Sequence, residues 1–218
     1  MSSDTPIITI DGPAGSGKGT IASLVAQKLG WHILDSGALY RLTALAALQQ
    51  NIASNDEETL SQLARNLDIA FELGEVYLAG QCVSLAIREE ECGNMASKIA
   101  AISTVRSALL QRQRDFQQAP GLIADGRDMG TVVFPHAAIK IFLTASAEER
   151  AKRRLNQLKQ NKISASLTRL IKEIKARDAR DINRQSSPLK AADDAIVIDS
   201  SFMTIADVVD QVMLLTQR

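Results

Sequence analysis

The sequence predicts an α/β fold in which helices cover both faces of a parallel sheet. Short apolar segments predict five buried strands, at Ile7–Ile10, His32–Leu34, Leu122–Ala124, Ile139–Leu143 and Ala195–Ile198. Helical patterns separate most of them, over Lys18–Leu29, Leu39–Gln49, Met95–Gln118, Ala147–Gln160, Leu167–Asp181 and Thr204–Leu215. Because strands that alternate with helices pair in parallel, ligands are expected beyond the carboxyl ends of the strands.

One stretch interrupts this alternation between the second and third predicted strands. Three short segments alternate or run apolar, with glycine-containing turns between them, at Leu67–Leu73, Val76–Leu78 and Cys82–Leu85. This pattern predicts a small antiparallel sheet inserted into the main fold. The insert is interpreted as a mobile cap over a second substrate, or alternatively as an insertion without a functional role.

Composition favours a soluble enzyme with one substantial core. The chain has 218 residues, of which 45% are hydrophobic and 23% charged. No apolar run reaches the roughly 18 residues that span a bilayer, and Met1–Asp4 lacks the features of a signal peptide. Cys82 and Cys92 form no metal or redox motif. A reducing cytoplasm is therefore the expected location.

The charge is balanced overall but unevenly distributed. A formal net charge of zero argues against nucleic acid or a membrane surface as the main partner. The segment Glu148–Arg184 nevertheless holds 12 of the 25 Lys and Arg residues and five acidic ones. Such a segment is either a solvated helix face or an anion clamp.

The segment after the first strand predicts a phosphate-binding loop. Its residues are Gly12, Pro13, Ala14, Gly15, Ser16, Gly17, Lys18, Gly19 and Thr20. A glycine-rich turn that opens a helix aims backbone N–H groups at an anion, and Lys18 adds a positive charge. The spacing matches the nucleotide-triphosphate signature, except that Gly19 stands where Ser or Thr is usual. A glycine-rich turn without a ligand is the alternative.

A second group of polar residues follows the third predicted strand. Asp125 is a candidate Mg²⁺ site, through water, or alternatively a capping or turn aspartate. The Arg127 guanidinium suits phosphate, whereas Asp128 suits hydrogen-bond donors on a base or sugar.

Further candidates lie on predicted helices. Ser36 is expected to cap the helix that contains Arg41. Helical spacing places Arg177, Arg180, Asp181 and Arg184 on one face, and Arg150, Arg153 and Arg154 show similar spacing on the preceding helix. These arginines either bind an anionic ligand or form an ordinary surface, balanced by acidic residues such as Glu173 and Asp178.

Taken together, these motifs resemble those of the bacterial cytidylate kinases, a branch of the nucleoside monophosphate kinases. The matching segments are Ile10–Thr20, Leu34–Arg41, Leu122–Pro135 and Ile174–Arg184, which occur in the family's order from end to end of the chain. Gly19 before Thr20 is the usual form in this family. The resemblance implies a P-loop kinase fold with a five-stranded parallel sheet flanked by helices, a small antiparallel β insert and a short helical lid.

The resemblance also implies an activity and roles for named residues. The expected activity is ATP-dependent phosphorylation of CMP or dCMP, with the loop from Gly12 to Thr20 on the ATP phosphates and Thr20 and Asp125 at Mg²⁺. The expected catalytic residues are Lys18, Arg127, Arg153 and Arg184. Residues expected to bind the substrate are Arg41, Arg127, Arg184 and Ser36 for its phosphate, Ser97, Arg106 and Asp128 for cytosine, and Arg177 and Asp181 for the sugar.

The family's layout implies one domain over residues 1–218. Its core would comprise residues 1–62, 103–147 and 185–218, with a monophosphate-binding insert over 63–102 and a basic lid over 148–184. The resemblance implies a monomer that acts in pyrimidine nucleotide metabolism on small molecules alone.

Other functions remain open from the sequence. One is a kinase of the same fold for UMP, AMP or shikimate. Another is a nucleotide-dependent switch or ATPase, which should hydrolyse nucleotide without any monophosphate, although the chain has no Asn-Lys-x-Asp guanine reader. The third is a non-catalytic nucleotide-binding module.

Overall fold

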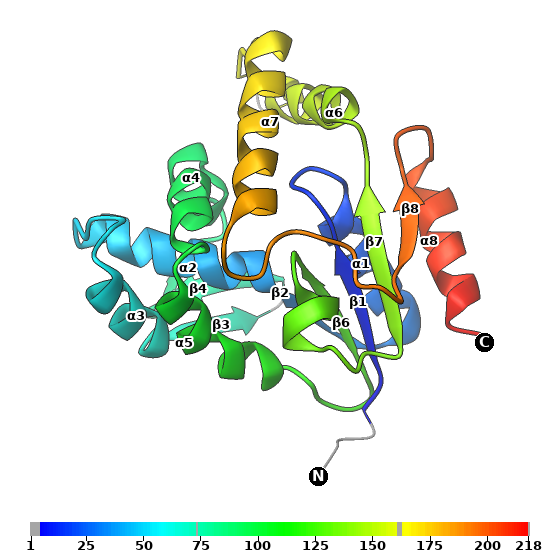
Figure 1. The fold of residues 1–218 in the computed structure, drawn as a ribbon, viewed down its shortest axis with the longest axis horizontal. Coiled ribbons are helices and arrows are strands. Elements are labelled where there is room, and N and C mark those ends of the chain that lie inside the picture. The colour runs from blue at the N-terminus through cyan, green and yellow to red at the C-terminus, as the bar shows by residue number, and fades with distance from the viewer. Residues whose placement is uncertain (1–4, 73, 161–162, 218) are drawn as a thin grey trace. The chain divides into compact units, whose positions relative to one another are not determined.

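The computed structural model describes residues 5–72, 74–160 and 163–217 and divides the chain into two compact units. The first unit contains the described residues up to Leu34 and those from Phe116 onward, and the second is Asp35–Asp115 (Figure 1). The second unit contains all of the predicted insert. The expectations for Met1–Asp4 and for Leu73 lie outside the described residues.

The first unit contains the predicted five-stranded sheet, in the order β2-β6-β1-β7-β8. The pairings of β1 with β6 and β7, and of β7 with β8, are parallel. The strands are β1 Ile7–Asp11, β2 His32–Asp35, β6 Leu122–Gly126, β7 Ile139–Thr144 and β8 Ile196–Asp199. All five predicted strands are therefore confirmed. The strand that leads into the glycine-rich loop is central because β6 and β7 flank it.

In the part of this unit that the structure describes, four helices and one π-helical turn accompany the sheet. They are α1 Lys18–Leu29, the turn η2 Met129–Val133, α6 Ala147–Gln160, α7 Leu167–Asn183 and α8 Ile205–Leu215. Ile8 and Ile10 of β1 are buried with Val25 of α1 and with Val208 and Val212 of α8. This apolar cluster fixes the central strand beneath α1, and thereby the start of α1 at the end of the loop.

The second unit contains helices and the predicted antiparallel sheet. Its helices are α2 Ser36–Gln49, α3 Glu57–Arg65, the short 3₁₀ turn η1 Ala86–Arg88, α4 Glu90–Ile99 and α5 Ser103–Arg114. Its strands are β3 Ile69–Glu72, β4 Glu75–Leu78 and β5 Gln81–Cys82, paired in that order. Helix α2 packs against α4, and α3 packs against α5.

Three local predictions for this unit were wrong or incomplete. The single helix expected over Met95–Gln118 is two helices, separated after Ile99 and ending at Arg114. Helix α3 was not predicted. Ser36 does not cap α2, because Asp35 is the capping residue and its Oδ1 accepts a hydrogen bond from the Ala38 N–H at 3.0 Å.

The described helices are too short or too polar to cross a membrane: none has an apolar stretch of the length that a bilayer requires.

Candidate functional site

The glycine-rich loop joins β1 to α1 in a conformation that its glycines permit. Gly12, Gly15 and Gly17 have positive φ angles, of 149°, 78° and 98°. A Cβ on Gly12 would lie 2.0 Å from the main-chain oxygen of Leu143, so no other residue fits there. The loop ends at the N-terminus of α1, where unsatisfied N–H groups and the helix dipole favour an anion.

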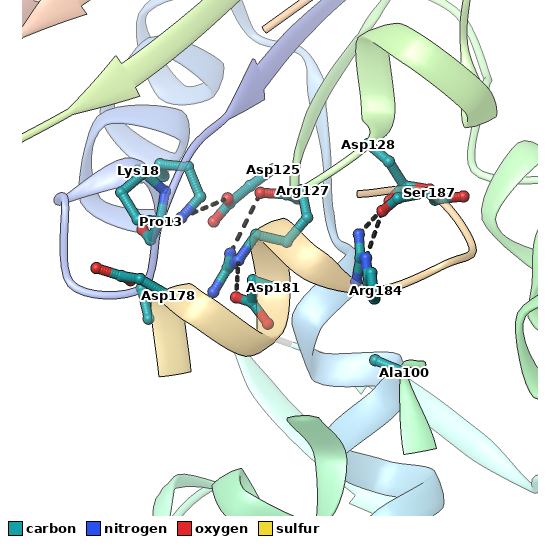
Figure 2. Close-up of polar contacts among 12 residues, drawn as sticks. Pro13, Lys18, Ala100, Asp125, Arg127, Asp128, Asp178, Asp181, Arg184 and Ser187 are labelled. Carbon is teal, nitrogen blue, oxygen red and sulfur yellow. Dashed lines mark hydrogen bonds and ion pairs between the residues drawn. The ribbon is translucent and has the colours of Figure 1, made fainter. Parts of the chain in front are cut away.

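Lys18, the first residue of α1, is buried beside Asp125. The Lys18 ammonium donates to the main-chain oxygen of Pro13 at 3.0 Å and lies 3.8 Å from Asp125 Oδ1 (Figure 2). Asp125 pairs in register with Ile10, so the β1–β6 pairing brings its carboxylate to the loop. A Cβ on Gly19 would lie 3.3 Å from Asp125 Oδ2. Glycine at position 19 therefore leaves room for the buried Asp125 carboxylate. This explains why Gly19 stands where Ser or Thr is usual.

Two ion pairs join the end of β6 to the end of α7. Arg127 Nε donates to Asp181 Oδ2 at 3.0 Å, and Arg184 Nη2 lies 4.0 Å from Asp128 Oδ1 (Figure 2). Asp128, Asp181 and Arg184 are all deeply buried. The structure thus brings together four predicted site residues in one unit, in alternating charge. Such pairs keep the buried charges compensated and fix the side chains' directions.

Arg184 does not share a helical face with Arg177, Arg180 and Asp181, as the sequence spacing suggested. Helix α7 ends at Asn183, and Arg184 has an extended backbone with ψ near 140°. Its Nε donates to the main-chain oxygen of Ser187. The end of the helix therefore turns Arg184 toward Asp128.

The arginines of α6 bind main-chain oxygens of the loop. Arg150 Nη1 donates to Ala14 at 3.0 Å, and Arg153 Nη1 donates to Ser16 at 3.1 Å. Arg153 also donates to the main-chain oxygen of Ser200 at 2.5 Å. Arg154, by contrast, is exposed. The guanidinium groups of Arg150 and Arg153 therefore lie against carbonyl groups of the loop.

Asp11 is a site residue that the sequence analysis did not single out. Its two carboxylate oxygens accept hydrogen bonds from the Met129 and Gly130 N–H groups, both at 2.8 Å. Burial raises the pKa of Asp11 to about 6, although those two hydrogen bonds oppose the rise. The charge of Asp128 raises this pKa further, and that of Lys18 lowers it. Its position at the end of a strand, beside the loop, was the available signal.

Ser36 and Arg41 lie in the second unit, on α2. Ser36 Oγ donates to Gln113 Oε1 at 2.7 Å, in a buried contact between α2 and α5. Arg41 Nη1 donates to the main-chain oxygen of Ile87 at 2.6 Å. A Cβ on Gly93 would lie 3.1 Å from the same nitrogen, so the guanidinium lies directly against α4.

Ser97 and Arg106 lie on different helices of this unit, α4 and α5, and both are buried. Arg106 Nη1 donates to the main-chain oxygen of Ala100 at 3.3 Å, and the guanidinium carbon lies 5.8 Å from the centre of the Tyr40 ring. A buried arginine held by a carbonyl and an aromatic face has a fixed direction. No sequence signal marks either residue.

Among the described residues, no group of three or more His, Cys, Asp or Glu side chains could hold a metal ion. A nucleotide-bound Mg²⁺ takes one or two protein oxygens together with phosphate oxygens and water, so it needs no such group. The buried Asp125 carboxylate beside the loop is such an oxygen, and Thr20, two residues after Lys18, carries a hydroxyl.

The chain is similar to known proteins over nearly its whole length. The family model described as "Cytidylate kinase" matches residues 8–218. The chain is 58% identical to the cytidylate kinase of Marinomonas sp. (strain MWYL1), over 100% of this chain and 98% of that protein. It is also 58% identical to the cytidylate kinase of Nitrosococcus oceani, over 98% and 96%. A crystal structure of a gluconokinase from Sinorhizobium meliloti 1021 shares the fold, with a TM-score of 0.50, 12% identity and coverage of 96% and 90%.

Proposed function

Because the chain belongs to the cytidylate kinase family, we propose that it transfers the γ-phosphoryl group of ATP to CMP or dCMP, giving ADP and CDP or dCDP. The observation that carries this proposal is the pair of ion pairs at the end of β6. Arg127 pairs with Asp181, and Asp128 with Arg184, at the end of the strand that pairs with β1. We propose phosphate-binding and base-binding roles for these side chains.

The loop and Lys18 are proposed to bind the ATP phosphates. Backbone N–H groups and the ammonium would compensate the negative charge on the β- and γ-phosphates. The Thr20 hydroxyl and the Asp125 carboxylate would hold Mg²⁺, which supplies further compensation of phosphate charge when bound. Arg153 of α6 is proposed to act together with the loop and Lys18 in compensating the charge of the ATP phosphates.

The residues proposed to bind the monophosphate are those that the family resemblance implies. Those proposed for its phosphate are Arg41, Arg127 and Arg184, with Ser36 nearby. Cytosine offers an amino donor and a ring-nitrogen acceptor, which Asp128 can accept from and Arg106 can donate to, with Ser97 as a further contact. Arg177 and Asp181 are proposed to face the sugar.

The chemistry needs no general base. The acceptor is a phosphate oxygen that is largely ionised at neutral pH, since the second phosphate pKa is about 6. The obstacle is repulsion between two polyanions whose reacting oxygens must lie in line. Lys18, Arg127, Arg153 and Arg184 would reduce this repulsion and stabilise charge on the transferring group.

We propose the family's layout for the chain: a core, a monophosphate-binding insert over residues 63–102 and a basic lid over 148–184. Closure of the insert and lid would exclude water, which otherwise hydrolyses ATP. We further propose a cytoplasmic monomer, active in pyrimidine nucleotide metabolism, without nucleic-acid or membrane partners.

Release of ADP with and without CMP tests the proposal. With Mg-ATP, we expect rapid ADP formation when CMP is added and at most slow formation without it. ADP release at an equal rate without any acceptor would contradict the proposal and favour a hydrolytic switch.

A further inference from the structure

Arg150 is a buried arginine whose hydrogen-bond donors contact three separate parts of the first unit. Its side chain is 4% exposed. The Nε group donates to the main-chain oxygen of Ala145, after β7, and Nη1 donates to that of Ala14 in the loop, both at 3.0 Å. The guanidinium also forms a two-pronged ion pair with Asp178 of α7, at 2.9 and 2.5 Å.

These contacts are typical of an arginine that holds other parts of the protein in place rather than of one that binds phosphate. An arginine has five N–H donors, and four of them are accounted for by these bonds. The aliphatic part of the side chain also lies against the loop, since a Cβ on Gly15 would meet Arg150 Cβ at 3.5 Å. Arg150 therefore lies on the side of the loop to which the Ala14 carbonyl points, with its guanidinium on that carbonyl and its aliphatic part near Gly15.

The contact with Ala14 has a consequence for the loop's anion-binding groups. In a trans peptide, the carbonyl of Ala14 and the N–H of Gly15 point in opposite directions. A charged donor that holds the carbonyl on one side therefore holds the N–H on the other, and polarises the peptide toward a stronger donor. Arg153 makes the equivalent contact two peptides further along the loop. It donates to the carbonyl of Ser16, and the same peptide carries the N–H of Gly17.

Asp178 extends this support to α7. It lies on the same helix as Asp181, whose carboxylate holds Arg127. The Arg150 guanidinium thus connects the glycine-rich loop with α7. The same helix carries Asp181, the partner of Arg127, which is proposed to bind the monophosphate.

We propose that Arg150 is a positioning residue that orients the loop for the ATP phosphates and, through Asp178, fixes α7 for the monophosphate. The coupling of the two substrate groups rests on the proposed function, whereas the effect on the loop concerns nucleotide binding alone.

The test separates these two effects. Calorimetric titration with Mg-ADP, without CMP, measures the loop, and the KM for CMP at saturating ATP measures the effect of α7. R150M should weaken Mg-ADP binding about tenfold, as expected for loss of a charge-assisted hydrogen bond, and should raise the KM for CMP. D178N, which leaves the Ala14 contact in place, should raise the KM for CMP with less than about a threefold change in Mg-ADP affinity.

K28M is the matched control, since Lys28 is an exposed basic residue of the same unit paired with Asp210. It should change neither value. If R150M does not fold, R150K replaces it, because an ammonium cannot reach all three acceptors at once. A folded Arg150 variant with wild-type Mg-ADP affinity overturns the proposal, even if its melting temperature falls. Absence of CMP-dependent activity in the wild type would instead reject the proposed function and leave the titration result interpretable.

Discussion

Asp11 shows how a single buried carboxylate can organise the loop that follows β6. Its two oxygens accept from consecutive N–H groups, at Met129 and Gly130, which immediately follow Asp128. A Cβ on Gly130 would lie 2.9 Å from Thr9 Oγ1, so this turn packs tightly on β1. The position of Asp128, the proposed cytosine contact, therefore depends on a residue of a neighbouring strand.

The raised pKa of Asp11 predicts a pH dependence of stability. Its pKa is about 6 in the folded protein and near 3.8 when unperturbed, because burial disfavours the charged form. Between these values the folded protein retains a proton that the unfolded chain has lost, so the free energy of unfolding falls as pH rises. D11N does not titrate and should lack this fall.

Urea unfolding of D11N and the wild type at pH 5 and pH 8 measures the effect. The difference in free energy of unfolding should shift in favour of D11N by about 1 kcal/mol from pH 5 to pH 8. Identical pH profiles for the two proteins would show that Asp11 does not titrate in this range.

Asp128 provides the prediction that concerns base selection. UMP presents a carbonyl and an N–H where cytosine has an amino group and an acceptor nitrogen, so a buried carboxylate discriminates between them. D128A should lower the ratio of kcat/KM for CMP to that for UMP by about tenfold, with the KM for ATP nearly unchanged. Steady-state kinetics with both acceptors provides the measurement. Equal losses for CMP and UMP would remove Asp128 from base recognition.

At the scale of elements, the break between α4 and α5 is the main difference from prediction. An apolar pattern continues from Met95 onward and favours one helix, yet the chain turns at Ile102, which has an extended backbone. The main-chain oxygen of Ala100 then accepts from Arg106. Because α4 packs on α2 whereas α5 packs on α3, tertiary packing favours two helices over the single one that the periodic pattern indicates. The break also helps to direct Arg106, a proposed substrate residue.

Other elements follow directly from local signals. Helices α1 and α6 have the predicted bounds. For α1, glycines mark both ends and the spacing of apolar residues marks the buried face. Helix α3 had a signal that was overlooked: Asp56 caps it and acidic residues occupy its first turn. Which strands would be neighbours in the sheet was not predicted, because pairing depends on contacts between distant segments.

The packing of α2 on α4 predicts the effect of a small change at Gly93. Alanine is favoured over glycine within a helix by about 0.5–1 kcal/mol, so G93A should fold. Its Cβ would nevertheless displace the Arg41 guanidinium, which lies 3.1 Å away. If Arg41 binds the monophosphate, the KM for CMP should rise about fivefold, equivalent to about 1 kcal/mol, with the KM for ATP unchanged.

The matched control for this change is N94A, at the exposed neighbouring position of the same helix. N94A should have wild-type kinetics. A folded G93A protein with the wild-type KM for CMP would argue against Arg41 as a phosphate ligand.

At the scale of the whole molecule, the balanced net charge conceals a specific internal arrangement. In the basic segment Glu148–Arg184, the described ion pairs include Arg150 with Asp178 and Lys175 with Glu148. Part of the segment's positive charge is thus neutralised by its own acidic residues. The sequence could identify the loop, Lys18 and the arginine-rich segment, whereas it could not show which arginines face carbonyls, carboxylates or ligands.

The acceptor preference of the protein is measured as kcat/KM for ADP formation from Mg-ATP with CMP, dCMP, UMP or AMP as acceptor. The other three acceptors differ from CMP in the base or the sugar, so the series tests the proposed recognition as a whole. We expect high values for CMP and dCMP and values at least about tenfold lower for UMP and AMP. A preference for UMP or AMP would contradict the proposed function and the roles of Ser97, Arg106 and Asp128.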